Sequence, residues 1–123
     1  MKDKESYYLV PGAQALVLLA ELKEMQDTAA YLMKHYAEVY AVDDWEQSPV
    51  PQLSEIYSGA RACASLLRTL MDQPTPPEVK HKVTGDGFCI TAMQYLEFVT
   101  MIESLRDLRK QASSTNNISF EVH

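Results

Sequence analysis

The chain has 123 residues, 46% of them hydrophobic, and a net charge of −6 from 17 acidic and 11 basic residues. This length and composition are typical of one folded domain, which we expect over residues 1–123 with residues 1–5 and 113–117 flexible. The acidic excess argues against direct nucleic-acid binding, which needs a concentrated basic surface. Two cysteines, Cys63 and Cys89, are too few for a disulfide framework.

The compartment follows from the absence of targeting signals in the sequence. The charged residues 1–5 have no apolar stretch behind them, so we expect no signal peptide. The longest apolar run, Ala15 to Ala20, is far shorter than a membrane span of about 20 residues. We therefore expect a cytoplasmic protein that does not enter the membrane.

A long amphipathic helix is predicted near the start of the chain. Apolar residues recur there at alternating steps of three and four, the heptad pattern of a helix that packs lengthwise against other helices. The pattern consists of Ala15, Leu18, Leu22, Met25, Ala29, Leu32, Tyr36 and Val39. We expect this helix to begin between Pro11 and Ala13 and to end near Ala41, after a strand-like run at residues 7–10.

A connector and a second helix are predicted next. Two prolines, Pro49 and Pro51, interrupt the helical pattern, and Trp45 in the connector either covers the end of the bundle or belongs to an interaction surface. The second helix is expected from about Gln52 to Met71. Its apolar positions, at the same alternating spacing, are Leu53, Ile56, Ala60, Cys63, Leu67 and Leu70.

The last third of the chain carries two capping-box patterns. Thr75 with Glu78 predicts a short helix, and Thr91 with Gln94 predicts the start of a third long helix that ends near Ala112. Between them, a turn around Gly85 precedes a short apolar run at residues 88–90.

Three segments are strand candidates, at residues 7–10, 88–90 and 118–122. They either pair as a small sheet or remain extended tails, or the last one docks onto another subunit. The predicted fold is all-α, or α with a minor β element. It is an antiparallel helical bundle of three long helices plus one short helix.

The sequence offers little that would support catalysis or metal binding. Glu78 and His81 form one Glu-x-x-His motif, and on the first helix the order is reversed, with His35 before Glu38. A di-iron bundle needs two such motifs with further carboxylates, so we expect no metal and no cofactor. Both cysteines lie among apolar neighbours, which argues against an activated thiol, so we expect a protein that is not an enzyme.

Two candidate sites remain, and both lie around the end of the first helix. Seven acidic residues and two lysines lie between Glu21 and Glu46, so this region could dock a basic partner. The candidate interaction surface is Glu38, Asp43, Asp44, Trp45 and Glu46. A candidate ligand pocket is formed by Tyr36, Tyr40 and Trp45.

The leading functional hypothesis is a non-enzymatic cytoplasmic interaction or adaptor protein that self-associates as a homodimer. Its first apolar seam is longer than the second helix can cover, and a second copy would bury the surplus. One alternative is an acidic antagonist, or mimic, that binds a basic nucleic-acid-handling protein. The other is a helical bundle that binds a small molecule.

Overall fold

The computed structural model describes residues 6–116 of the chain. Three long helices dominate it: α1 (Gly12–Val39), α2 (Val50–Asp72) and α3 (Ala92–Asn116). Two short strands, β1 (Tyr7–Val10) and β2 (Phe88–Thr91), and two 3-10 helices, η1 (Val42–Gln47) and η2 (Lys80–Lys82), complete it. The third strand candidate, residues 118–122, lies outside the described residues.

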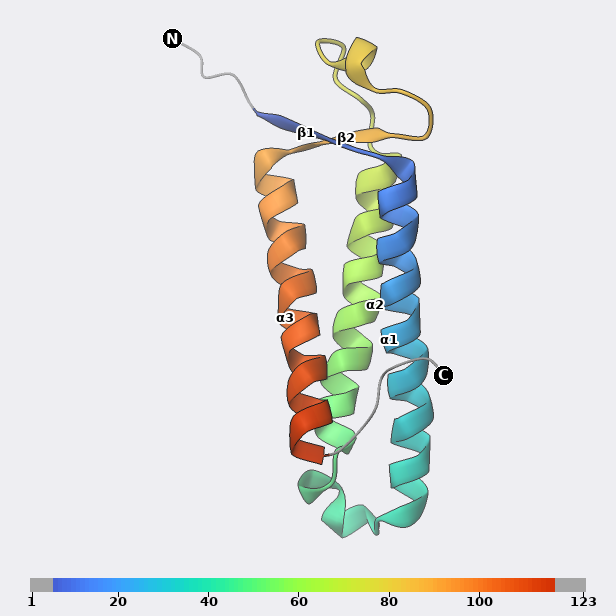
Figure 1. Cartoon of the computed structure of the whole chain (residues 1–123). Coiled ribbons are helices and arrows are strands. Elements are labelled where there is room, and N and C mark those ends of the chain that lie inside the picture. The colour runs from blue at the N-terminus through green and yellow to red at the C-terminus, as the bar shows by residue number, and fades with distance from the viewer. Residues whose placement is uncertain (1–5, 117–123) are drawn as a thin grey trace.

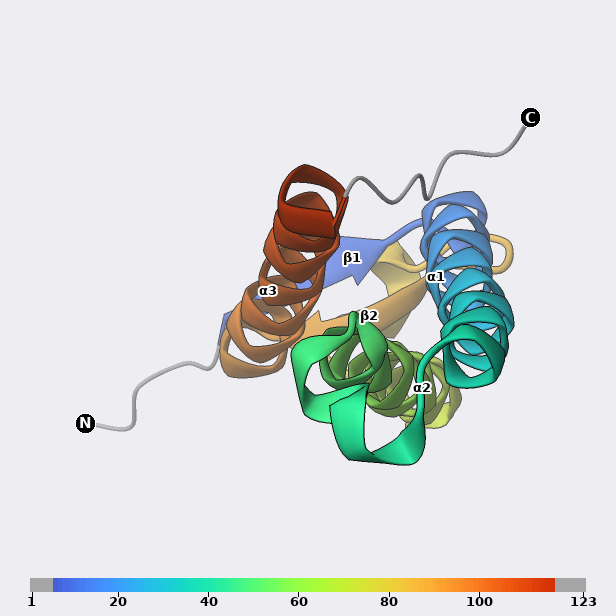
Figure 2. The ribbon, with the colours of Figure 1, turned by 90° about the horizontal axis from the view of Figure 1, so that it is seen from below.

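The helices form an elongated bundle with the strands at one end and η1 at the other (Figure 1). We call these the sheet end and the connector end. Helix α2 runs antiparallel to α1 and α3 and packs against both of them (Figures 1 and 2). Within residues 6–116 no comparable packing joins α1 to α3, which run in the same direction. The prediction of a helical bundle with a minor β element is confirmed.

Two of the three strand candidates pair with each other. Strands β1 and β2 are antiparallel, with Tyr7 opposite Thr91 and Val10 opposite Phe88, and they lie across the end of the bundle (Figure 1). The sheet thereby ties the segment before α1 to the segment before α3. The sequence left this pairing open, and the structure decides it.

The predicted seams form the core, with one exception. All six seam residues of α2 are buried, as are Ala15, Leu22, Met25 and Ala29 of α1. Leu18, Leu32 and Tyr36 of the α1 seam are half-buried, and Val39 is 64% exposed, so within the described residues the end of this seam is not covered. Helix α1 has 28 residues and α2 has 23, and the last turn of α1 extends past the helix that covers it (Figure 1).

Three predicted boundaries differ from the observed ones. Helix α2 begins at Val50, because Pro51 falls in its first turn, where a missing N–H costs no hydrogen bond. The capping box predicted at Thr75 does not start a regular α-helix, and the segment forms only turns and the three-residue η2. Two prolines follow Thr75, and the residue before the second of them is driven away from helical geometry. Helix α3 continues to Asn116, so residues 113–116 are helical rather than a flexible linker. Ala112 is fully buried and keeps this part of α3 packed.

The second capping box is confirmed at the start of α3. The Thr91 N–H donates to Gln94 Oε1 at 2.9 Å, and the Gln94 N–H donates to Thr91 Oγ1 at 3.1 Å. The Gln94 side chain also exchanges hydrogen bonds with Gln73 at the end of α2. Gly85 has a φ of +56°, so the expected turn uses the left-handed backbone that glycine favours.

Candidate functional site

The predicted acidic surface lies at the connector end and faces solvent. Its carboxylates come from the last turn of α1 and from η1, and all of them are exposed: Glu38, Asp43, Asp44 and Glu46. The structure therefore brings these charges together at one end of the bundle. That they dock a basic partner stays a prediction.

The three aromatic residues of the predicted pocket also lie close together. Trp45 Nε1 donates to the Tyr40 carbonyl at 3.2 Å, and the rings of Tyr36 and Tyr40 have centroids 6.1 Å apart. Trp45 is half-buried and folds back on the end of α1. Three cavities within residues 6–116 are lined by other side chains, and a ligand pocket at this position stays a prediction.

A cavity opens at the sheet end, between α1 and α3 and beneath the strands. Its volume is about 420 Å³. Its walls are mainly apolar side chains from both strands and all three helices, and they include Leu18, Leu70, Phe88, Ile90, Phe98 and Ile102. Polar side chains also line it, among them Gln14, Glu103 and Arg106. The cavity exists because α1 and α3 both pack on α2 without packing closely on each other.

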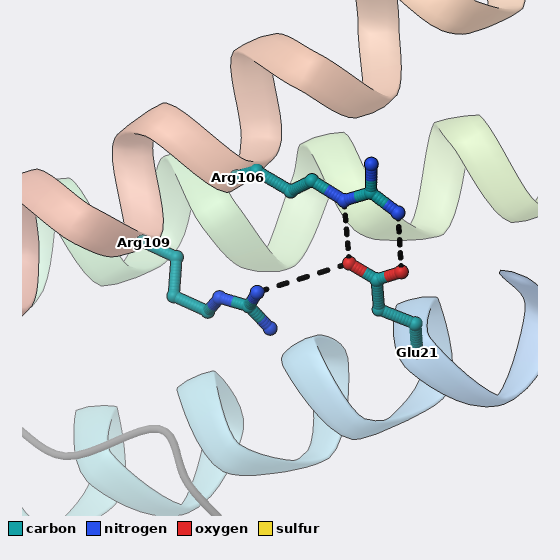
Figure 3. A network of polar contacts seen from close by, with 3 residues as sticks. All are labelled: Glu21, Arg106 and Arg109. Carbon is teal, nitrogen blue, oxygen red and sulfur yellow. Dashed lines mark hydrogen bonds and ion pairs between the residues drawn. The ribbon is translucent and has the colours of Figure 1, made fainter.

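One ionic bridge spans α1 and α3 at this cavity (Figure 3). Arg106 binds both carboxylate oxygens of Glu21, at 2.8 and 2.7 Å, and Arg109 lies 3.8 Å from the same carboxylate. The Arg106 hydrogen bonds lower the pKa of Glu21 and outweigh the opposing effect of burial, and both guanidinium charges add to the shift. The same hydrogen bonds raise the pKa of Arg106. Sequence reasoning missed this pair, because the two residues are 85 positions apart.

A second feature that the sequence analysis missed is the outer face of the first half of α1. No charged residue occurs from Ser6 to Ala20. Leu16 and Val17 point away from the core and are 62% and 68% exposed. Ala13 and Ala20 are exposed as well. We call these four residues, Ala13, Leu16, Val17 and Ala20, the α1 outer face. The absence of charged residues in this segment was the sequence signal for an exposed apolar face. At the level of sequence, the segment was compared only with the length of a membrane span.

Other exposed apolar side chains gather at the same end. They come from β1 and from the first turns of α3, and they are Tyr8, Leu9, Met93 and Leu96. Tyr8 stacks on Tyr95 with ring centroids 4.3 Å apart. Large apolar side chains are exposed at the connector end as well, namely Val39, Tyr40 and Val42. Exposed groups of this kind are typical of an interaction surface.

Neither cysteine is suited to act as a nucleophile. Burial, with a smaller effect from the charge of Glu21, raises the pKa of Cys63 to about 11. Burial also raises the pKa of Cys89, and the charge of Glu78 adds to it. Both thiols therefore stay protonated at neutral pH, whereas the thiolate is the reactive form. In residues 6–116 no group of three or more histidine, cysteine or acidic side chains could hold a metal ion.

No helix within the described residues is both long enough and apolar enough to cross a membrane. Comparison of the chain with protein-family models, curated proteins and solved structures gave no match. The functional argument therefore rests on the geometry of this chain.

Proposed function

We propose that this is a non-enzymatic helical interaction or adaptor protein of the cytoplasm that self-associates as a homodimer. One observation carries the proposal: large apolar side chains are exposed on this small domain, among them Leu16, Val17, Met93 and Leu96 at the sheet end and Val39 and Val42 at the connector end. Apolar surface of this kind is stabilised by burial against a partner. Closed two-fold dimers are the commonest way for one chain to achieve this.

The energetics set the expected strength of the dimer. Full burial of a leucine or valine side chain contributes about 1.5–3 kcal/mol. Association itself costs roughly 4–15 kcal/mol in lost freedom of movement. The few large exposed side chains therefore support a weak, concentration-dependent dimer rather than a permanent complex.

Light scattering coupled to gel filtration tests this proposal. We expect the average mass to rise from monomer toward dimer as the protein concentration rises from about 1 to about 100 µM. The dimer should persist in 1 M NaCl, because apolar burial is not screened by salt, whereas contacts between exposed charges are. A monomer at every concentration would contradict the proposal.

The cavity between α1 and α3 favours a second candidate, a bundle that binds a small apolar molecule. Its volume of about 420 Å³ lies in the range typical of ligand sites, and most of its lining side chains are apolar. An uncharged solvatochromic dye should become fluorescent in the native protein and lose this signal when Val99→Trp fills the cavity. Tyr31→Trp, an exposed position on α1, is the control. No dye signal with the native protein would remove this candidate.

A further inference from the structure

We infer that the cavity between α1 and α3 takes an uncharged amphiphile, whose apolar chain lies along the helices and whose head group accepts a hydrogen bond from Arg106. The inference rests on the second candidate function, the bundle that binds a small molecule, and names the class of ligand. The observations are the shape of the cavity, the place of its charged side chains, and the balance of charge around Arg106.

The cavity is long and is apolar over most of its length. The residues of α3 that line it run from Tyr95 to Arg106, roughly 16 Å along the helix at about 1.5 Å per residue. Between these two positions α3 contributes the apolar side chains of Phe98, Val99 and Ile102. An unbranched apolar chain suits a site of this shape, because it buries its surface along the whole wall.

The charged side chains of the lining lie together at one end of the cavity. Glu103 and Arg106 are the lining residues of α3 farthest from the strands, since α3 begins beside β2 and runs toward the connector end (Figure 1). Gln14, at the start of α1, is exposed and uncharged. A ligand with one polar head and one apolar chain matches this uneven distribution.

Arg106 keeps hydrogen-bond donors for a ligand while it binds Glu21. The bridge uses its Nε and one Nη group, at 2.8 and 2.7 Å (Figure 3). The other Nη group points away from the Glu21 carboxylate (Figure 3), and a guanidinium carries N–H donors on all three of its nitrogens. Because Arg106 also lines the cavity, it can donate to an acceptor atom of a ligand there.

The charge of Arg106, unlike its donors, is already balanced. Glu21 binds it with both carboxylate oxygens, and Glu103 lines the same end of the cavity one turn earlier on α3. The hydrogen bonds from Glu21 and, with a smaller effect, the charge of Glu103 raise the pKa of Arg106. Arg109, 3.8 Å from Glu21, is not among the residues that line the cavity. A carboxylate head would meet two carboxylates and lose its hydration, whereas a hydroxyl or carbonyl head loses much less.

Titration calorimetry with octanol and octanoate tests this assignment at about pH 8, where a carboxyl group is ionised. The native protein should bind octanol, and should bind octanoate more weakly. Glu21→Gln should raise the affinity for octanoate by about fivefold or more, because Arg106 then carries an unbalanced charge, and should change the affinity for octanol by less than about twofold. Glu38→Gln, at an exposed position of α1, removes the same charge and should change neither affinity. Circular dichroism checks that the variants keep the native helix content.

Arg106→Met provides the complementary test, because it keeps an apolar stem and removes the N–H donors. It should weaken octanol binding by about threefold or more. The inferred ligand class is overturned by native protein that prefers octanoate, by an octanoate affinity that does not rise in Glu21→Gln, or by an octanol affinity that Arg106→Met leaves unchanged. Native protein that binds the solvatochromic dye but not octanol would also overturn it, and would leave the candidate function standing. If neither the dye nor octanol binds, the candidate function and this inference fail together.

Discussion

The two ends of the bundle differ in how they are built and in what they expose. At the sheet end, a strand pair ties the segment before α1 to the segment before α3, a capping box begins α3, and large apolar side chains are exposed beside charged ones such as Asp86 and Glu97. At the connector end, a short 3-10 helix joins α1 to α2 and presents carboxylates. The same helix α1 therefore contributes to two unlike surfaces. The placement of charge along it, more than its net charge, indicates where each kind of partner could bind.

The largest effect on the free energy of unfolding is expected on the α1 seam, where a buried position can be compared with an exposed one. Leu22 is fully buried, so Leu22→Ala should lower the free energy of unfolding by about 2–5 kcal/mol through lost burial and a cavity. Val39→Ala at the exposed end of the same seam should change it by less than about 0.5 kcal/mol. Urea unfolding of both variants measures this. Equal losses would mean that the seam is covered along its whole length.

A smaller loss is expected from tight packing at the sheet end. A Cβ added to Gly12 would lie 2.7 Å from Asp86 Cβ and 2.8 Å from the Asp86 carbonyl oxygen. Gly12→Ala should therefore lower the free energy of unfolding by about 1–3 kcal/mol, since the backbone there must move. Gly59→Ala is the comparison, because its new Cβ meets only the end of the Leu105 side chain and the change raises helix propensity by about 1 kcal/mol. A larger loss at Gly59 than at Gly12 would contradict this packing.

The ionic bridge should give a smaller, pH-dependent effect. The pKa of Glu21 is lowered from 4.5 in the folded state, so its contribution to stability is present above that value and is lost as the pH falls through the lowered pKa. Since both partners are partly exposed, we expect at most about 1 kcal/mol. Glu21→Gln should remove this part of the acid dependence in urea unfolding between about pH 2 and pH 6. Glu38→Gln, at an exposed position of α1, should keep it, and identical profiles for native protein and Glu21→Gln would contradict the bridge.

The smallest effect on folding is expected at the connector end. Asp43→Asn, Asp44→Asn and Glu46→Gln together should change the free energy of unfolding by less than about 0.5 kcal/mol, because all three side chains are exposed. The triple variant should still dimerise but should bind polylysine more weakly, which surface plasmon resonance can measure. Unchanged polylysine binding would argue against this end as a site for a basic partner.

Local patterns in the sequence predicted the helices and their main boundaries. The seams of α1 and α2 repeat every three or four residues, and Thr91 with Gln94 marks a helix start within four residues. Such signals depend on neighbours along the chain, so a single sequence contains them. Where they failed, as at Thr75, a second proline overrode the pattern.

Contacts between distant segments could not be predicted in this way. The pairing of Tyr8 with Ile90 and the bridge from Glu21 to Arg106 depend on how α1 and α3 are placed around α2. The cavity between α1 and α3 could not be predicted for the same reason, because its lining residues come from both strands and all three helices. The acidic site could be placed from the sequence because its residues are nearly consecutive.

The central claim is the proposal that a second copy covers apolar surface at the sheet end of the bundle. Val17→Cys and Val39→Cys form a matched pair, at 68% and 64% exposure on one helix, and the native Cys63 and Cys89 are buried. Thiol labelling under native conditions, from about 1 to about 100 µM protein, measures the cover directly. We predict that labelling at position 17 slows as the concentration rises while labelling at position 39 does not. Equal, concentration-independent rates at both positions would contradict the claim.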